Sequence, residues 1–279
     1  MRPITIPSYI RDIWNTGSIT KENNIDLVKQ HYKELLKGEP EVSIVIPAYN
    51  EEKNIMRTLL SLSTNTTSRS VEIIVVNNNS VDNTEMLVKA SGVGCIRETK
   101  QGITAARNKG LANAKGKYIL NADADSIYPK AWIEEMVAPL ANNDRVSITY
   151  GRFAFIPTGR TSRFSYFLYE NMADLVRWFN KTFREEAVNV YGFNSGFRKA
   201  QGIEVNGFDH PPLVNEDGWL AIKLRDKGYG KLHYVTNEKA RVWTDDRRII
   251  IDGGLWNALY LRIKRTLFPS KNMIHRTDL

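Results

Sequence analysis

The chain has 279 residues, which is enough for one large domain or two small ones and for a substantial core. Hydrophobic residues make up 42% and charged residues 25%, which argues against extensive disorder, and the single cysteine excludes an internal disulfide framework. The net charge of +8 favours an anionic partner: nucleic acid, a phosphorylated substrate or an anionic membrane face.

Residues 1–40 read as an N-terminal helical extension. Apolar residues recur at helical spacing over residues 23–36, and Gly38 and Pro40 end the helix. No catalytic pattern occurs here, so we expect this helix to pack on the main domain. The extension lacks the apolar core of a secretory signal, and no stretch approaches 18 uninterrupted apolar residues. We therefore expect a cytoplasmic protein, with the inner face of the cell membrane as the place of any peripheral contact.

Residues 41–145 alternate short apolar runs with amphipathic stretches. Continuous apolar strands separated by helices are typical of a parallel sheet covered on both faces, which is the doubly wound α/β pattern. The first strand is expected to end before Pro47. The predicted strands are 42–46, 71–76, 93–96 and 117–120, and the predicted helices are 51–63, one from about 82, and 104–114.

The alternation breaks after about residue 145. The predicted elements there are strands 146–150, 153–156 and 231–235 and helices 160–183, 216–226 and 254–268. We therefore divide a main domain, 41–240, into halves 41–145 and 146–240, the second with mixed strands. Residues 241–279 form a C-terminal basic amphipathic helical segment.

Polar side chains follow three of the predicted strands. The first strand is followed by Pro-Ala-Tyr-Asn-Glu at 47–51, the second by three asparagines and a serine at 77–80, and the fourth by Asn-Ala-Asp-Ala-Asp at 121–125. Ligands of open α/β sheets bind beyond the carboxyl ends of the strands, so these residues are expected to share one rim. Asp123 and Asp125 could hold a hard divalent ion there, whereas the alternative for such a pair is an Asx-turn.

Two further segments carry candidate residues near predicted helix starts. Residues 102–108 open a helix that includes Arg107, and both a helix N-terminus and an arginine favour phosphate. The alternative for Arg107 is an ordinary surface charge. Glu216 and Asp217 begin another helix, where carboxylates often only complement the helix dipole. A general base would need one of them aimed into a cleft.

Taken together, six segments resemble glycosyltransferase family 2, a large inverting family with the GT-A fold. They follow the family's order over about residues 42–235. The matching segments are 42–52 (VSIVIPAYNEE), 75–84 (VVNNNSVDNT), 106–110 (ARNKG), 121–125 (NADAD), 205–209 (VNGFD) and 215–217 (NED). The resemblance implies an α/β fold: a GT-A type, doubly wound, Rossmann-like nucleotide-binding sheet with a mixed acceptor-side half.

The resemblance also implies a nucleotide diphosphate sugar of UDP, GDP or dTDP type as the donor, and Mn²⁺ or Mg²⁺ as the cofactor. Asp123 would contact the nucleotide ribose or the metal, and Asp125 would hold the metal across the diphosphate. Asp217, with Glu216 in the family's Glu-Asp motif, would be the general base. The residues that would bind the nucleotide sugar are Pro47, Ala48, Tyr49, Glu51, Asn77, Asn79, Arg107 and Asp123.

Two departures from the family pattern matter. The family commonly has Asp at the position of Asn77, where it accepts a hydrogen bond from the nucleotide base, so the identity of the nucleotide stays open. The Gln-x-x-Arg-Trp signature of processive members is absent, which argues against a polymerising synthase.

Residues 240–248 look like a Val-x-Thr-Ser-x-Arg-Arg pattern of some soluble bacterial members, with Asp245 at the serine position. Our hypothesis is that Arg247 or Arg248 reaches the leaving diphosphate, and the alternative is a solvated basic run. On the acceptor side, Asn194 lies where such enzymes build the acceptor site. Trp219 could stack on an acceptor sugar or lie in the core.

The C-terminal helix predicted at 254–268 has an apolar face and basic flanks. Residues 241–279 hold eight Lys or Arg and four Asp or Glu, so half of the net charge lies there. Such a helix can lie on an anionic membrane, which would suit a lipid-linked acceptor. The alternative is a helix packed on the catalytic domain with a charged outer face.

We therefore expect an inverting, metal-dependent, non-processive glycosyltransferase acting on a glycan or lipid-linked acceptor in cell-envelope glycan, polysaccharide or lipopolysaccharide assembly. A sugar nucleotidyltransferase would normally show a Gly-rich phosphate loop where this chain has residues 47–51. A non-catalytic nucleotide-sugar-binding relative fits less well with the intact Asp123, Asp125 and Asp217. The charge permits a nucleic-acid-binding protein, but no such motif occurs, and the rim carboxylates would repel phosphate without a metal.

Overall fold

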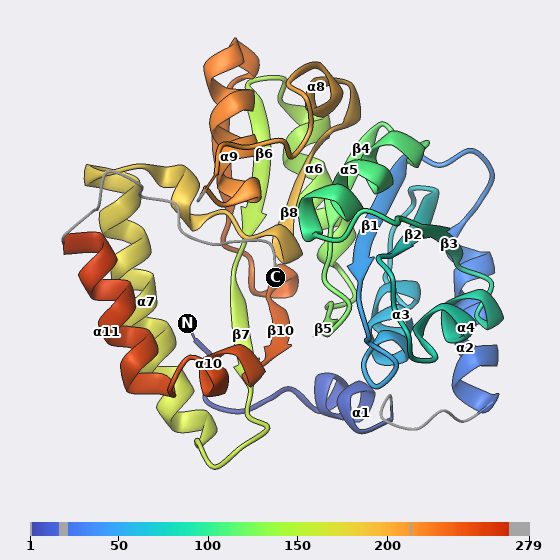
Figure 1. Ribbon diagram of the computed structural model, residues 1–279, viewed down its shortest axis with the longest axis horizontal. Coiled ribbons are helices and arrows are strands. Elements are labelled where there is room, and N and C mark those ends of the chain that lie inside the picture. The colour runs from blue at the N-terminus through green and yellow to red at the C-terminus, as the bar shows by residue number, and fades with distance from the viewer. Residues whose placement is uncertain (1, 17–21, 213, 268–279) are drawn as a thin grey trace.

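The computed structural model describes residues 2–16, 22–212 and 214–267. Its centre is a seven-stranded sheet in the order β3-β2-β1-β4-β8-β6-β9, accompanied by a three-stranded sheet in the order β5-β10-β7 (Figure 1). The large sheet comprises β1 (Val42–Ala48), β2 (Val71–Asn77), β3 (Gly94–Arg97), β4 (Tyr118–Asn121), β6 (Val146–Gly151), β8 (Ser195–Arg198) and β9 (Lys231–Val235). The small sheet comprises β5 (Ser126–Ile127), β7 (Phe153–Ile156) and β10 (Val242–Asp245).

Helices cover both faces of the large sheet, because its strands are buried on both sides. Buried side chains form one cluster with α3 and α6 and another with α5 and α9. The described α-helices are α1 (Ser8–Thr16), α2 (Glu22–Leu35), α3 (Ile55–Ser63), α4 (Thr84–Ala90), α5 (Ile103–Asn113), α6 (Trp132–Asn142), α7 (Arg163–Phe183), α8 (Lys199–Glu204), α9 (Glu216–Leu224), α10 (Arg247–Ile251) and α11 (Leu255–Leu267).

The first half confirms the predicted parallel α/β arrangement. Strand β1 pairs in parallel with β2 and β4, and β2 pairs in parallel with β3. The N-terminal helix α2 packs on this half as expected, since Val28, Tyr32 and Leu35 join the core. The hydroxyl of Tyr32 also accepts a hydrogen bond of 3.2 Å from the backbone N–H of Ile73 in β2.

The predicted end of the first strand was wrong, because β1 continues through Pro47 to Ala48. Proline has no N–H to donate and is normally confined to edges of sheets. In β1 the carbonyl of Val45 accepts from Ala122 on the β4 side, and the ladder with β4 stops at Val45. Pro47 faces the same side two residues later, so its missing donor leaves no strand partner unsatisfied.

The second half has the mixed strands that the sequence predicted. Strand β8 lies antiparallel between β4 and β6, and β6 pairs in parallel with β9. Helix α9 is shorter than predicted and ends at Leu224, where a π-helical turn, Arg225–Tyr229, takes over. Gly228 has φ +94° inside that turn, a conformation that favours glycine.

The small sheet brings the C-terminal segment to the Asp-x-Asp turn. Strand β10 pairs antiparallel with β5, placing Thr244 opposite Ser126, and runs parallel to β7. Trp243 of β10 is 2% exposed and packs with Ile127. Residues 242–245 are therefore held against the loop that follows β4.

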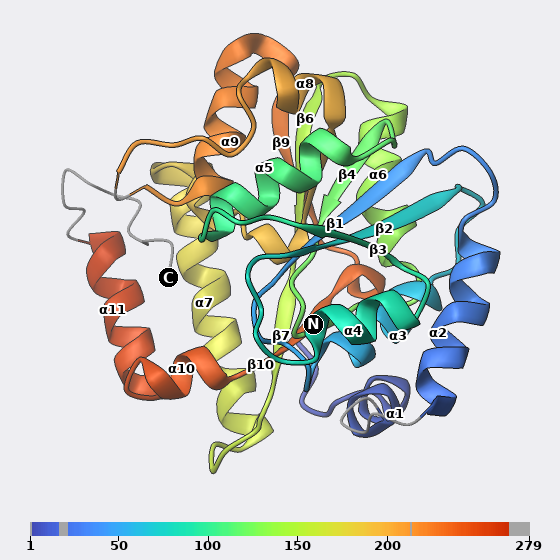
Figure 2. The same ribbon diagram turned by 45° about the vertical axis from the view of Figure 1, so that its right-hand side comes forward.

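Helices α7 and α11 run side by side away from the sheet (Figure 2). The inner face of α11 packs through Leu255, Ala258 and Leu259 against the core. Its outer face combines two aromatic side chains, Trp256 at 80% and Tyr260 at 58% exposed, with the exposed Lys264. The expected packing of this helix on the domain is therefore observed, but the part of its outer face that the structure describes is not simply charged.

Arg2 ties the start of the chain to α7. Its guanidinium is buried and lies 2.7 and 2.8 Å from the two carboxylate oxygens of Asp174, and it also donates to the carbonyl of Phe153. Burial alone would raise the pKa of Asp174, but the hydrogen bonds and charges of Arg2 and Arg177 outweigh it and hold that pKa well below its usual range.

This ion pair predicts an acid-sensitive contribution to stability. A carboxyl with a depressed folded-state pKa stabilises the fold above its unfolded pKa of about 3.9, and the contribution is lost progressively as the pH falls from that value through the folded-state pKa. We expect Arg2→Ala to lower the free energy of unfolding by about 3 kcal/mol at pH 7, because Asp174 loses a buried partner. Urea unfolding at pH 7 and pH 3 measures the difference, which should shrink at pH 3; an equal difference at both pH values would contradict the assignment.

Candidate active site

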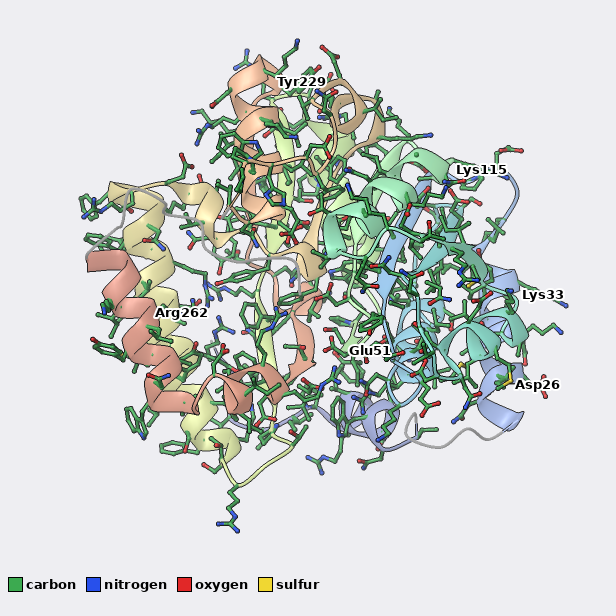
Figure 3. All side chains as sticks on the ribbon, in the orientation of Figure 1. Asp26, Lys33, Glu51, Lys115, Tyr229 and Arg262 are labelled. Atoms are coloured by element: carbon green, nitrogen blue, oxygen red, sulfur yellow. The ribbon has the colours of Figure 1, made fainter. Side chains whose placement is uncertain are left out.

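The rim predicted at the carboxyl ends of β1, β2 and β4 is formed, and it carries an exposed aromatic residue. Ala48 and Asn77 face each other as the last residues of β1 and β2. Tyr49 follows directly and is 52% exposed. Glu51 lies in the central region of the molecule, far from the α7–α11 pair on which Arg262 is labelled (Figure 3).

The asparagines after β2 build the rim. Asn77 is 1% exposed, donates to Glu85 Oε2 at 2.6 Å and accepts from the backbone N–H of Ser80 at 3.0 Å. Asn79 has φ +63° and donates to the carbonyl of Thr99 at 2.9 Å. The side chain of Asn77 is thus engaged within the turn, where the family's usual Asp would carry a charge.

Arg107 joins two carboxylates at the centre of the site. It extends from α5, is 1% exposed, and its Nη2 lies 3.1 Å from Asp123 Oδ1 while its Nε lies 3.6 Å from Asp217 Oδ1. Nε and Nη1 of Arg107 and Oδ1 of Asp217 have no hydrogen-bond partner among the described residues. A Cβ at position 192 would overlap both Arg107 and the Asp217 carboxylate, so Gly192 permits this close approach.

The surroundings of the Asp217 carboxyl favour its protonated form. Asn215 caps α9 by accepting from Gly218, which places Asp217 in the first turn. Burial raises the pKa of Asp217 well above its usual value, and the charges of Glu216 and Asp123 add to this, while Arg107 opposes it. Burial likewise raises the pKa of Asp123 to about 6, again against Arg107. Glu216 is itself buried beside Asp217.

A second carboxylate group lies around Arg247, the first residue of α10. Its guanidinium contacts Asp125, Glu51 and Asp245, at 2.7, 3.3 and 2.7 Å. The hypothesis that Arg247 or Arg248 reaches the leaving diphosphate stays a prediction. The participation of Asp245 was missed, because it was taken only as a substitute for serine in the C-terminal pattern.

Three other predicted residues have different surroundings. Asn194 is 1% exposed, and its amide accepts from Trp132 Nε1 at 2.8 Å and donates to the carbonyl of Arg152 at 2.7 Å. The side chain is thus bonded inside the scaffold, and its predicted contact with an acceptor stays a prediction. Trp219 is partly exposed and lies two residues after Asp217 in α9. Arg248 is exposed, and its charge favours the ionised form of Asp123.

A hollow of about 560 Å³ adjoins the Arg247 group. Arg57 lies beneath it, 6% exposed, with its guanidinium 3.5 Å from the ring centre of Trp14. Burial lowers the pKa of Arg57 to about 10. The hollow is lined by Trp14, Asn50, Glu52, Lys53, Asn54, Arg57, Asp82, Thr158, Asp245 and Arg247.

The carboxylate oxygens of Asp125 and Asp123 are ligands of the kind that a hard divalent ion prefers. Mg²⁺ and similar ions are commonly held by one or two carboxylates together with substrate phosphates. Asp125 is partly exposed at the rim and already contacts one cation, the guanidinium of Arg247. The described residues contain no group of three or more His, Cys, Asp or Glu side chains arranged to hold a metal alone. Asp125, with Asp123 nearby, would therefore need oxygen ligands from a substrate.

Solved structures with a similar fold are glycosyltransferases. The mannosyltransferase PcManGT from Pyrobaculum calidifontis, in complex with GDP-Man and Mn²⁺, matches with a TM-score of 0.60 and 18% identity over 92% of this chain and 73% of that one. S. aureus TarS 1-349 with UDP-GlcNAc matches with a TM-score of 0.56 and 19% identity over 74% and 59%. This confirms the predicted GT-A type fold.

Curated relatives are also named as glycosyltransferases. The probable glycosyltransferase YdaM of Bacillus subtilis is 30% identical over 226 residues, which is 76% of this chain and 52% of that protein. The glycosyltransferase AglE of Haloferax volcanii is 30% identical over 48% of this chain and 46% of its own length. The chain thus spans about half the length of these relatives. The model of glycosyl transferase family 2 matches residues 43–202, more than half of the chain, and the protein belongs to that family.

Proposed function

We propose that the protein is an inverting, metal-dependent glycosyltransferase that moves a sugar from a nucleoside diphosphate sugar to an acceptor hydroxyl. The observation that carries this proposal is the division of the site's carboxylates into two groups. One group, with Asp125, lies at the rim beside an arginine, and the other is the buried Asp217 held by Arg107. Such a division suits a leaving group that needs cations and an acceptor that must lose a proton.

On the donor side, the rim residues would bind the nucleotide. Tyr49 offers an exposed ring for the base, and Asp123, which is partly exposed, would contact a ribose or the metal. Asp125 would hold Mn²⁺ or Mg²⁺, which when bound neutralises the charge that grows on the departing diphosphate. The solved complexes support this choice, since PcManGT is described with GDP-Man and Mn²⁺ and the glucosyl-3-phosphoglycerate synthase of Mycobacterium tuberculosis with Mn²⁺ and UDP.

On the acceptor side, Asp217 would accept the proton of the attacking hydroxyl. The acceptor oxygen forms a bond to the anomeric carbon while the bond from that carbon to the diphosphate oxygen breaks. No enzyme nucleophile intervenes, so the anomeric configuration inverts. Arg107 orients Asp217 and balances its charge, and Trp219, two residues further along α9, offers a partly exposed ring for the acceptor.

We further propose that the α7–α11 side of the molecule rests on an anionic membrane surface, which would present a lipid-linked acceptor. Helix α7 exposes a row of large apolar side chains. In an ordinary surface helix the solvent-facing side is charged or polar. Trp256 and Tyr260 of α11 add aromatic groups suited to a membrane interface. No helix in the described ranges is long and apolar enough to cross a bilayer. The row comprises Phe164, Leu168, Met172, Leu175, Trp178 and Phe183.

Flotation with vesicles of anionic lipid tests this surface. We expect wild-type protein to float, and Leu175→Asp combined with Trp256→Asp to reduce the bound fraction strongly, since charges would replace apolar contacts. Asn113→Asp on α5 and Asn142→Asp on α6 together provide the same change of charge at exposed polar positions outside this surface. Equal flotation of both double variants and the wild type would remove the membrane contact.

The experiment that tests the proposed function is a thermal-shift panel of UDP, GDP, dTDP and CMP, each with and without Mn²⁺. We expect one nucleoside diphosphate to stabilise the protein much more with Mn²⁺ than without it, by the linkage of binding to folding. Asp125→Asn should strongly reduce the metal-dependent part at the same Mn²⁺ concentration. If no nucleotide stabilises the protein, a nucleoside diphosphate sugar is not its donor.

A further inference from the structure

The guanidinium of Arg247 lies among three carboxylates, as a bound metal cation would. Its Nη2 lies 2.7 Å from Asp125 Oδ2 and 3.3 Å from Glu51 Oε1, and its Nε lies 2.7 Å from Asp245 Oδ2. The three carboxylates come from three separate segments: one follows β1, one follows β4 and one ends β10. Asp125 is also the carboxylate to which we assign the metal. The arginine and a metal would thus use the same partner.

Positive charge near the carboxylates around Arg247 stabilises their ionised forms. Burial and the charge of Asp125 raise the pKa values of both Glu51 and Asp245. One cation, Arg57, is a fixed part of the fold, because it is buried, stacks on Trp14 and donates to Asn54.

Arg247 is less enclosed than Arg57. Its side chain is 46% exposed and belongs to the first residue of a five-residue helix. It borders the hollow lined by Lys53 and Asn50, so space for another position lies beside it. Arg57 is thus enclosed by the fold, whereas nearly half of the Arg247 side chain faces solvent.

We propose that Arg247 is a displaceable counter-ion of the donor site. It occupies Asp125, Glu51 and Asp245 while the site lacks a metal, and it moves to the diphosphate when metal and donor bind together. This inference rests on the proposed function. A divalent ion on Asp125 would lie within a few ångströms of the guanidinium and repel it. Guanidinium groups bind phosphate in a bidentate manner, so the diphosphate gives Arg247 a new partner.

The consequence is cooperative binding. Metal alone must displace Arg247 without giving it another anion, whereas metal with a nucleoside diphosphate supplies one. Each ligand therefore raises the affinity for the other by the same factor. Arg247 also lowers the affinity for metal alone, so removing it should tighten that binding.

Titration of the nucleotide-free protein with Mn²⁺, followed by the electron paramagnetic resonance of free Mn²⁺, tests the proposal. We expect Arg247→Ala and Arg247→Gln to bind Mn²⁺ at least about fivefold more tightly than the wild type, a coupling of ordinary size. Arg247→Lys keeps the charge and should stay near the wild type. Adding the nucleoside diphosphate selected by the thermal panel should raise Mn²⁺ affinity in the wild type and raise it less in Arg247→Ala.

Lys53→Ala is the matched control, because it removes a positive charge from the same hollow. Among the described residues no ion pair joins Lys53 to these carboxylates, so its Mn²⁺ affinity should change little. Unchanged or weaker Mn²⁺ binding by both neutral variants, with binding lost in Asp125→Asn, would overturn the counter-ion role and leave the donor site standing. If no variant binds Mn²⁺ even with nucleotide, the proposed metal site fails as well.

Discussion

Replacing Asp217 by asparagine is expected to lower kcat by roughly 10²–10⁴-fold, the usual contribution of a general base. Asparagine keeps the shape of the side chain but cannot accept the proton of the acceptor hydroxyl. Donor affinity should change little, because in the proposed mechanism Asp217 acts on the acceptor hydroxyl and does not hold the nucleotide sugar. Steady-state kinetics of nucleotide release, with donor binding measured by calorimetry, separates the two effects.

The pH profile gives the same prediction a second readout. A general base must be ionised, and burial raises the pKa of Asp217 above its ordinary value. Activity should therefore fall as the pH drops at values well above 4, and this acidic limb should be absent from the residual rate of Asp217→Asn.

Glu216→Gln is the matched control for Asp217→Asn. Glu216 is the neighbouring carboxylate in the same first turn of α9, and it is buried to a similar degree. It should lose far less activity than Asp217→Asn. A larger loss in Glu216→Gln would assign the base to Glu216 instead.

Asp125→Asn is expected to lower kcat/KM by roughly 10²–10³-fold, the scale seen when one group that stabilises transition-state charge is removed. The amide is a poorer ligand for a hard cation than a carboxylate. It also removes the charge that Arg247 contacts at 2.7 Å. Kinetics over a range of Mn²⁺ concentrations should show that excess metal recovers part of the loss.

The control for Asp125→Asn is Glu52→Gln, which removes a negative charge that borders the same hollow. Glu52 accepts two hydrogen bonds from Asn83, and a glutamine oxygen can accept them as well. Its activity and metal dependence should stay close to the wild type. Equal losses in the two variants would mean that the general charge of the rim matters and a specific metal ligand does not.

The parallel half of the fold could be predicted from the sequence because its signals are local. Continuous apolar runs such as that of β1 are buried on both faces, and each is followed by a recognisable turn. Strand β8 gave no such signal, since its four residues include only one large apolar side chain, Phe197, and its place is set by β4 and β6. Helix α6 could have been found from Ile133, Met136, Val137 and Leu140, but Pro139 interrupts the pattern.

The residues of the candidate site also fall into those that local sequence predicts and those that only tertiary contacts bring together. The rim residues follow predicted strands directly, so their convergence could be inferred from topology alone. Asp245 reaches Asp125 only because β10 pairs with β5, a contact between residues far apart in the sequence. The burial of Asn194 likewise depends on Trp132, which lies in a helix that was not predicted. Such tertiary contacts leave no local pattern to read.

The most direct test of the central claim is the position of the metal itself. Crystals grown with Mn²⁺ and the nucleoside diphosphate from the thermal panel would locate it by anomalous scattering. The account predicts a peak beside the Asp125 carboxylate and next to the bound diphosphate, with the Arg247 guanidinium moved onto the diphosphate. A nucleotide bound at the rim with no Mn²⁺ at Asp125, or Mn²⁺ bound away from the nucleotide, would contradict it.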